Sequence, residues 1–366
     1  MTRRSERPRR DDATDPGRAG GRWRLRNWRL RTKLLAVLLI PVLAVVVLVG
    51  LRIAADLGSA DDFAEGAEGV RVDATVAVVI HELQRERDLT VRYVAGGRQA
   101  GIDELRTQRE RVDSALGEFD RTLTAASSNL SSQAVAGFRD LAGRFEVLTD
   151  LRYAGENSSV GADAVLRSYG DLVSGILDIG DQAATSVSDG DLARGRLTAN
   201  ALARVKDQLS VRRALVAEAL ATGQLPADRA RALVAAEAEL AAARKDFAKF
   251  ATAEQRRMYD ETVIGAPVDV GNGMVESVLA RAEAAEPFTG LDHQQWETSA
   301  TSTVNLVKQV QDAVLLQIQQ RSDDLAVEAR QSALTDGGVM LGVLLVAAVL
   351  TMLIARSLLR PLRLLR

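Results

Sequence analysis

The chain has 366 residues, a formal net charge of −2 and 47% hydrophobic residues, but only 4% aromatic residues. So few aromatic residues suit the packing of helix on helix better than a β-sheet. Cysteine is absent, which excludes disulfides, thiolate metal sites and cysteine nucleophiles. The chain is long enough to stabilise a folded domain by core packing alone.

Charge is unevenly distributed along the chain. Segment 1–33 carries about +8, segment 356–366 about +4 and the middle about −14. Basic ends around an acidic centre are typical of a membrane protein with both termini in the cytoplasm. We expect 1–33 to be a disordered, basic cytoplasmic tail. Its position beside an apolar segment favours attraction to membrane lipid over nucleic-acid binding.

Two apolar segments are long enough to cross a bilayer. They are 34–51, LLAVLLIPVLAVVVLVGL, and 337–355, GGVMLGVLLVAAVLTMLIA. A cleaved signal peptide is the alternative for the first, but no small-residue cleavage site follows near Arg52. Basic residues flank the outer ends of both segments, which predicts a multi-pass protein of the cell membrane with 52–336 outside the cytoplasm.

Long helices are expected between the two spans, because that region holds only three prolines. No alternating strand pattern of useful length occurs. The predicted fold is all-α, with two packed helical bundles outside the membrane and two transmembrane helices. Apolar residues recur at helical spacing near 72–94, 102–123, 138–148, 160–186, 202–220, 227–262 and 269–284, and a last helix runs from about His293 into the second span.

Two basic residues fall on apolar helix faces. Arg87 lies one turn after Leu83 on the first face, and Arg213 lies within the stripe between Leu209 and Val216. A buried guanidinium is costly unless it is paired. Guanidinium groups that converge from separate helices repel each other and favour a planar oxyanion between them.

The alternative is a purely structural role for these arginines. Each could pair with a nearby carboxylate, for example Glu86, Asp88 or Asp207, or extend to the surface. The sequence QRER, which includes Arg87, recurs at 108–111, and Arg109 also falls near an apolar stripe. Position on an apolar face therefore does not separate a binding arginine from a structural one.

Three segments carry a resemblance to a known family. ELQRERDLTVRYVAGG, SYGDLVSGILDIGDQAA from Ser168 and ALARVKDQLSVRRALVAEALATG from Ala201 resemble motifs of the nitrate- and nitrite-sensing (NIT) domain family. The resemblance covers about 70–330. It implies an all-helical double bundle that binds nitrate or nitrite through arginines from separate helices.

Matching positions give the site residues that the resemblance implies. They are Arg85 and Arg87 in the first motif and Arg213 in the second, with Arg212 beside it. The resemblance implies a further arginine, for which Arg256, Arg257 and Arg281 are the alternatives. The sequence departs from the family pattern at three positions: Asp88 replaces a usual Gly, and Asp207 and Arg212 each replace a usual Glu.

The C-terminal segment 356–366, RSLLRPLRLLR, resembles the start of a HAMP linker. HAMP domains relay signals to kinase, cyclase or chemotaxis modules. The resemblance implies the sensor end of a longer receptor, a sensor histidine kinase of a two-component system being favoured, or a truncated product. A homodimer is expected from this receptor plan.

The leading interpretation is a membrane receptor module that binds a small anion. The alternatives are a helical-bundle receptor for another ligand or partner protein, and a membrane tether without a signalling role. An enzyme is not expected, because His81 and His293 are the only histidines and no HExxH, P-loop, GxGxxG or nucleophile-elbow motif occurs. No cofactor or metal is expected.

Overall fold

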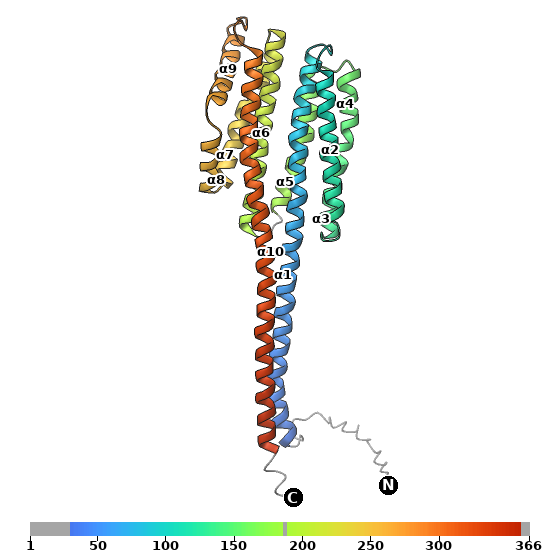
Figure 1. The fold of residues 1–366 in the computed structure, drawn as a ribbon, viewed down its shortest axis with the longest axis vertical. Coiled ribbons are helices and arrows are strands. Elements are labelled where there is room, and N and C mark those ends of the chain that lie inside the picture. Colours follow the sequence, from blue (N-terminus) through green and yellow to red (C-terminus); the bar gives the residue numbers. More distant parts are fainter. Residues whose placement is uncertain (1–29, 186–188, 360–366) are drawn as a thin grey trace, which may run out of the picture. The chain divides into compact units, whose positions relative to one another are not determined.

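The computed structural model describes residues 30–185 and 189–359. Within these ranges all regular structure is helical, which confirms the all-α prediction. Figure 1 shows the elements in chain order: α1 Leu30–Ala95, α2 Ile102–Ala126, α3 Ser132–Arg144, the 3₁₀ turn η2 Phe145–Val147, α4 Leu148–Asn157, α5 Ala162–Thr185, α6 Gly190–Thr222, α7 Ala227–Phe250, α8 Ala253–Thr262, α9 Ala266–Glu283 and α10 His293–Leu359.

The chain divides into two compact units. One combines the chain up to Asp56 with Ser332–Arg366, and the other is Leu57–Gln331. The long helices α1 and α10 each contribute residues to both units. The predicted domain boundaries lie a few residues away and remain predictions.

In the first unit, α10 is the helix of the described chain that is long and apolar enough to cross a membrane. It contains an 18-residue window with mean hydropathy 2.1, no part of which is buried. α1 has a shorter apolar stretch, Leu43–Arg52. The side chains of 34–42 lie outside the described residues, so the first span remains a prediction. The basic tail up to residue 29 and the HAMP-like core at 360–362 also lie outside them.

Local signals in the sequence explain where the helices of Leu57–Gln331 begin and end. The Asp189 side chain accepts a hydrogen bond from the amide of Leu192 at 2.7 Å and caps the start of α6. Thr252 and Gln255 form a reciprocal capping box at the start of α8. Gly223 ends α6 with φ 70°, a left-handed conformation that costs glycine little.

Two of the predicted helices were wrong in extent. The helix expected over 227–262 is interrupted after Phe250, because Ala251 is extended and Thr252 starts a new helix. The apolar residues at 138–148, expected on one helix, are divided among α3, the 3₁₀ turn η2 and α4. At Thr252 the capping box outweighed the continuous apolar spacing.

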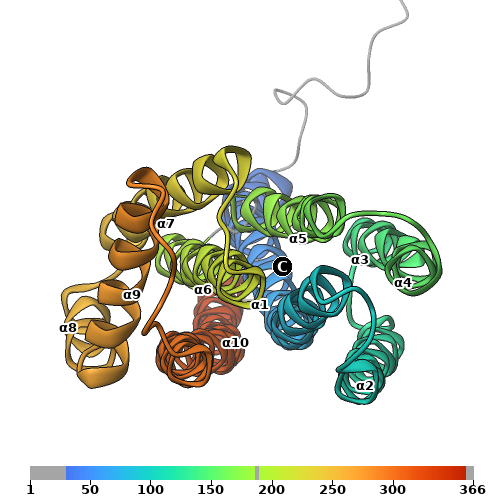
Figure 2. The same ribbon diagram turned by 90° about the horizontal axis from the view of Figure 1, so that it is seen from above.

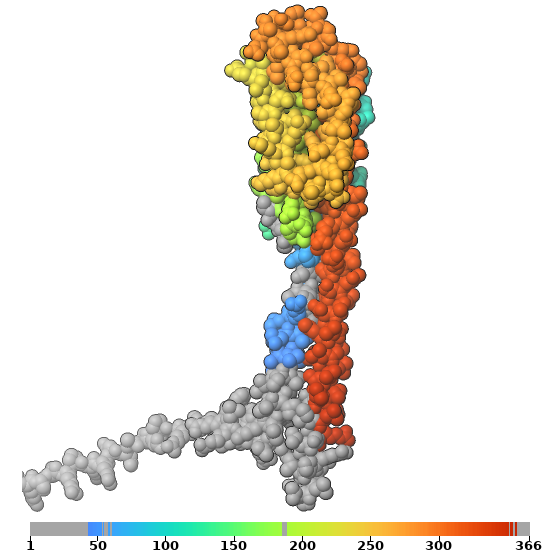
Figure 3. Space-filling model, turned by 90° about the vertical axis from the view of Figure 1, so that its left-hand side faces the viewer, coloured from blue at the N-terminus to red at the C-terminus, as the bar shows by residue number. Residues whose placement is uncertain are grey.

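The core of Leu57–Gln331 consists of two groups of buried apolar side chains. The larger draws on α1–α7, α9 and α10, and the smaller on α1, α6, α7 and α10. The view along the helices in Figure 2 shows α2–α4 on one side and α7–α9 on the other, with α1, α5, α6 and α10 between them. Figure 3 shows the surface on which α7–α9, in yellow to orange, cover the helices behind them. Arg85 and Arg87 lie on α1, and Arg212 and Arg213 lie on α6, two of these central helices. The further candidates Arg256 and Arg257 lie on α8, and Arg281 lies on α9.

Candidate oxyanion site between α1 and α6

Arg87 is a fully buried cation on α1. It follows Leu83 by one turn, and that leucine is buried as its helical spacing predicts. Arg87 Nη1 donates a hydrogen bond to Asp207 Oδ1 on α6 at 2.8 Å, and Nη2 donates to the backbone carbonyl of Asp207 at 3.2 Å. Its Nε lies 3.5 Å from Asp88 Oδ1. Carboxylates from two helices therefore compensate this charge.

Arg213 approaches the same place from α6. Its side chain is 4% exposed, between the buried residues Leu209 and Val216. Its Nε donates to Asp88 Oδ2 at 2.9 Å, and its Nη2 forms a second bond to the same oxygen. Nη1 donates to Thr301 Oγ1 on α10 at 3.2 Å. The guanidinium therefore connects three helices.

Asp88 lies between the two arginines. Its Oδ2 accepts from Arg213 and from Ser210 Oγ at 2.5 Å, while its Oδ1 faces Arg87. We call Arg87, Asp88, Asp207, Ser210 and Arg213 the arginine cluster. Its two guanidinium and two carboxylate groups balance in formal charge, as a buried ionic group requires.

The charges of the cluster support one another. Burial opposes the charge on Arg87, but the charges of Asp207 and Asp88 outweigh it and raise the pKa of Arg87. Gln84 Nε2 donates to Asp207 Oδ1 at 3.2 Å and occupies a further lone pair of that carboxylate. The cluster thus resembles an oxyanion site whose oxyanion, Asp88, is part of the chain.

The other two predicted site residues have different partners. Arg85 Nη2 pairs with Glu104 on α2 at 3.1 Å, and burial and the charge of Arg213 lower the pKa of Arg85. Arg212 Nη1 donates to Asn272 Oδ1 on α9 at 3.0 Å and lies 3.4 Å from Glu237. Burial lowers the pKa of Arg212. Arg87 and Arg213 therefore share the carboxylate of Asp88. Arg85 lies at the edge of the cluster, and Arg212 points towards α9.

Comparison with known proteins identifies the family. A family model described as nitrate and nitrite sensing matches residues 78–319. The chain belongs to this nitrate- and nitrite-sensing family. Among solved structures it is similar to the NasR transcription antiterminator, with a TM-score of 0.63, 19% identity and 85% of each chain covered. That likeness shows the fold alone. Among curated proteins, none matches the chain.

The match to the nitrate- and nitrite-sensing family includes the whole arginine cluster and a second buried group that the sequence did not reveal. Glu86, fully buried on α1, accepts bonds from Arg152 Nε at 2.9 Å and Nη2 at 2.8 Å, and from the Tyr169 hydroxyl at 2.7 Å. Arg109 Nε lies 3.8 Å away. The recurrence of QRER had drawn attention to Arg109, but nothing in the sequence shows that α1, α2, α4 and α5 meet at Glu86.

A buried ammonium lies near the cluster. Lys206 Nζ on α6 is buried and donates to Gln311 Oε1 on α10 at 2.7 Å, a neutral partner. Burial, and then the charge of Lys308, lowers the pKa of Lys206 to about 7. Burial and the charge of Lys206 lower the pKa of His81 to about 3, so His81 is neutral at pH 7.

We expect Lys206 to make the stability of the protein vary with pH above neutrality. Its folded-state pKa of about 7 lies below its ordinary value of 10.5, so between these values the unfolded chain binds the proton more tightly. Stability therefore rises with pH across this window and falls back as pH drops towards 7. Urea unfolding of the chain in detergent at about pH 7 and pH 10 should show this rise.

Lys206→Met should remove this rise in the free energy of unfolding with pH, and the exposed Lys245→Met should keep it. If the free energy of unfolding of Lys206→Met rises with pH as it does in the unchanged chain, Lys206 does not titrate in this window.

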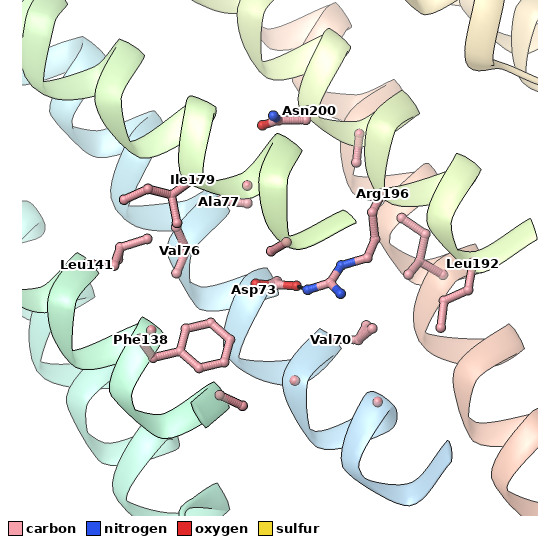
Figure 4. A pocket seen from close by; sticks show the side chains of 18 of the residues that line it. Val70, Asp73, Val76, Ala77, Phe138, Leu141, Ile179, Leu192, Arg196 and Asn200 are labelled. Atoms are coloured by element: carbon pink, nitrogen blue, oxygen red, sulfur yellow. Dashed lines mark hydrogen bonds and ion pairs between the residues drawn. The ribbon is translucent and has the colours of Figure 1, made fainter. Parts of the chain in front are cut away.

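A separate cavity of about 810 Å³ lies among α1, α3, α5, α6 and α10 (Figure 4). Its walls are mostly apolar, for example Val76, Phe138 and Ile179. Asp73 and Arg196 form an ion pair across it, and burial lowers the pKa of Arg196 to about 10. The sequence did not predict this pair, because Asp73 and Arg196 lie on none of the apolar helix faces identified from it.

Among the side chains that the structure describes, no group of three or more His, Asp or Glu could hold a metal ion. The chemistry that the arginine cluster offers is instead the binding of a planar anion by hydrogen bonds from fixed donors.

Proposed function

We propose that this chain is the sensor module of a membrane receptor, and that nitrate or nitrite binds at the arginine cluster. The observation that carries the proposal is the meeting of Arg87 and Arg213 on one carboxylate, Asp88. These arginines come from parts of the chain far apart in sequence. The match to the nitrate- and nitrite-sensing family supports the choice of anion.

The geometry of the donors suits this class of ligand. A guanidinium is planar and presents its N–H groups in a fixed fork, which matches an oxyanion with two or three coplanar oxygens. Buried donors interact more strongly with a charge than donors in water do. Nitrate and nitrite are planar, carry one negative charge and resemble the carboxylate that these arginines hold in this structure.

The cluster contacts the helices that would carry a signal. Arg87 lies on α1, and Arg213 contacts α10 through Thr301 and through its own carbonyl, which accepts a bond from Trp296 Nε1 at 3.1 Å. Both α1 and α10 continue into the predicted membrane segments. A small shift of either helix is the kind of change by which receptors of this plan would carry a signal.

The remaining features of the proposal come from the sequence. Spans at 34–51 and 337–355 would place 52–336 outside the cytoplasm and both termini inside it. The output would be a cytoplasmic module, a histidine kinase being favoured, reached through a HAMP linker. The module would act as a homodimer in contact with lipid, and by binding rather than by catalysis.

The cavity in Figure 4 favours a second candidate function, a receptor for a larger organic ligand. A volume of about 810 Å³ lies within the range of small-molecule sites. The ion pair of Arg196 and Asp73 would orient a polar group on a mostly apolar molecule. In this case nitrate and nitrite would have no effect on stability.

Nitrate or nitrite should stabilise the whole chain in detergent. At about 100 times its dissociation constant, a ligand that binds the folded state alone adds about 2.7 kcal/mol to the free energy of unfolding. Calorimetric melting at constant ionic strength, with chloride replaced by nitrate or nitrite, measures this effect. Arg213→Gln should abolish it, whereas the exposed Arg139→Gln should retain it. Identical melting of the unchanged chain in all three salts would refute the ligand assignment.

A further inference from the structure

Asp88 has the contacts that an anionic ligand of the arginine cluster would have. Its side chain is 5% exposed. It accepts two bonds from Arg213 and one from Ser210 on α6, and it faces Arg87 on its own helix. A bound oxyanion would need these same donors, so it could not occupy the position while Asp88 remains there.

The charge balance leads to the same conclusion. Arg87 and Arg213 supply two positive charges, and Asp88 and Asp207 supply two negative charges. Asp207 also accepts from Gln84 and is fixed on the far side of Arg87. An anion entering the complete cluster would meet no unpaired cation and would lie beside the negative charge of Asp88, which is unfavourable in a buried site.

We propose that Asp88 is an internal anion that competes with the external ligand for Arg213, Ser210 and Arg87. This inference rests on the proposed function and assigns to Asp88 the control of affinity at that site. In the structure the chain's own carboxylate fills the position. An external anion binds by displacing the Asp88 side chain.

The same exchange supplies a signal. Asp88 lies on α1, whereas Arg213 and Ser210 lie on α6, so the Asp88 contacts hold the two helices together. When a free anion replaces Asp88, these donors are satisfied by a group that is not attached to α1. The ion pair of Asp88 with Arg213 is then broken, while the ion pair of Arg87 with Asp207 still connects α1 and α6. The two states differ in their contacts with the ligand, as a ligand-driven shift between conformations requires.

The test removes the internal anion and measures nitrate binding by isothermal titration calorimetry on the whole chain in detergent. Asp88→Ala vacates the position, and Asp88→Asn removes the charge with little change in volume. We expect both variants to bind nitrate about tenfold more tightly than the unchanged chain, within the usual range of coupling between competing groups. Asp103→Asn, at a carboxylate that is 96% exposed, should leave the affinity unchanged.

A second measurement covers the case in which Asp88→Ala is too unstable for titration. Formate, a small planar carboxylate, should raise the melting temperature of Asp88→Ala towards that of the unchanged chain, and acetate should do so less well because of its methyl group. The same salts should not raise the melting temperature of Asp88→Ala combined with Arg213→Gln.

The outcomes separate this inference from the proposed function. If the unchanged chain and both Asp88 variants bind nitrate with equal affinity, Asp88 does not compete and the inference is wrong, although the sensing function stands. If only the Asp88 variants bind nitrate, the internal anion is real and the nitrate function of the unchanged chain is wrong. If nitrate binds neither the unchanged chain nor the Asp88 variants, and formate does not stabilise Asp88→Ala, then both the inference and the nitrate-sensing function are wrong.

Discussion

Glu86→Ala is expected to lower the free energy of unfolding by about 3–5 kcal/mol, the cost of removing one partner from a buried ionic group. Glu86 is fully buried and accepts two bonds from Arg152 and one from the Tyr169 hydroxyl. Its loss removes the partner of two Arg152 donors and of the Tyr169 hydroxyl in a buried place, although Arg152 keeps its contact with Asp113. Urea unfolding of the chain in detergent, monitored by circular dichroism, measures the loss.

Two control variants assign this effect to the carboxylate. Glu86→Gln keeps the shape and some of the hydrogen bonds but removes the charge, so it should have an intermediate effect. The exposed Glu110→Ala, at the equivalent position of the second QRER sequence, should change stability by no more than about 0.5 kcal/mol. A loss for Glu86→Ala as small as that for Glu110→Ala would show that the buried contacts of Glu86 do not stabilise the fold.

Trp296→Ala should lower the free energy of unfolding by a similar amount, about 3–5 kcal/mol. Trp296 is fully buried near the start of α10, within the larger apolar core. Its Nε1 donates to the carbonyl of Arg213 at 3.1 Å. Truncation to alanine removes the ring, leaves a cavity and loses this bond between α10 and α6, and the same unfolding measurement detects it.

Trp296→Phe separates the two contributions of the indole. It fills most of the space but has no N–H group, so it should lose less stability than Trp296→Ala. Because the lost bond reaches the backbone of Arg213, Trp296→Phe should also weaken any nitrate-induced stabilisation. A loss for Trp296→Ala below about 1 kcal/mol would mean that this end of α10 is not held by the tryptophan.

The positions of the arginines on their helices could be predicted from sequence, but their partners could not. Helical spacing alone predicted that Arg87 and Arg213 face the core, and both are buried there. Asp88 and Asp207 were possible partners, and the structure selects them. Glu86 was named beside them, yet it turns towards Arg152, because adjacent residues on a helix point about 100° apart.

Local sequence determined that the described chain is helical, where many of its helices start and stop, and that Arg87 and Arg213 face the core. These properties depend on residues within a few turns of one another, such as an apolar stripe, a Ser or Asp cap or a glycine at a helix end. The tertiary structure decided which charges meet: Asp88 with Arg213, Asp207 with Arg87, and Arg152 with Glu86. Such pairs lie tens to more than a hundred positions apart, so only the packing of whole helices can bring them together.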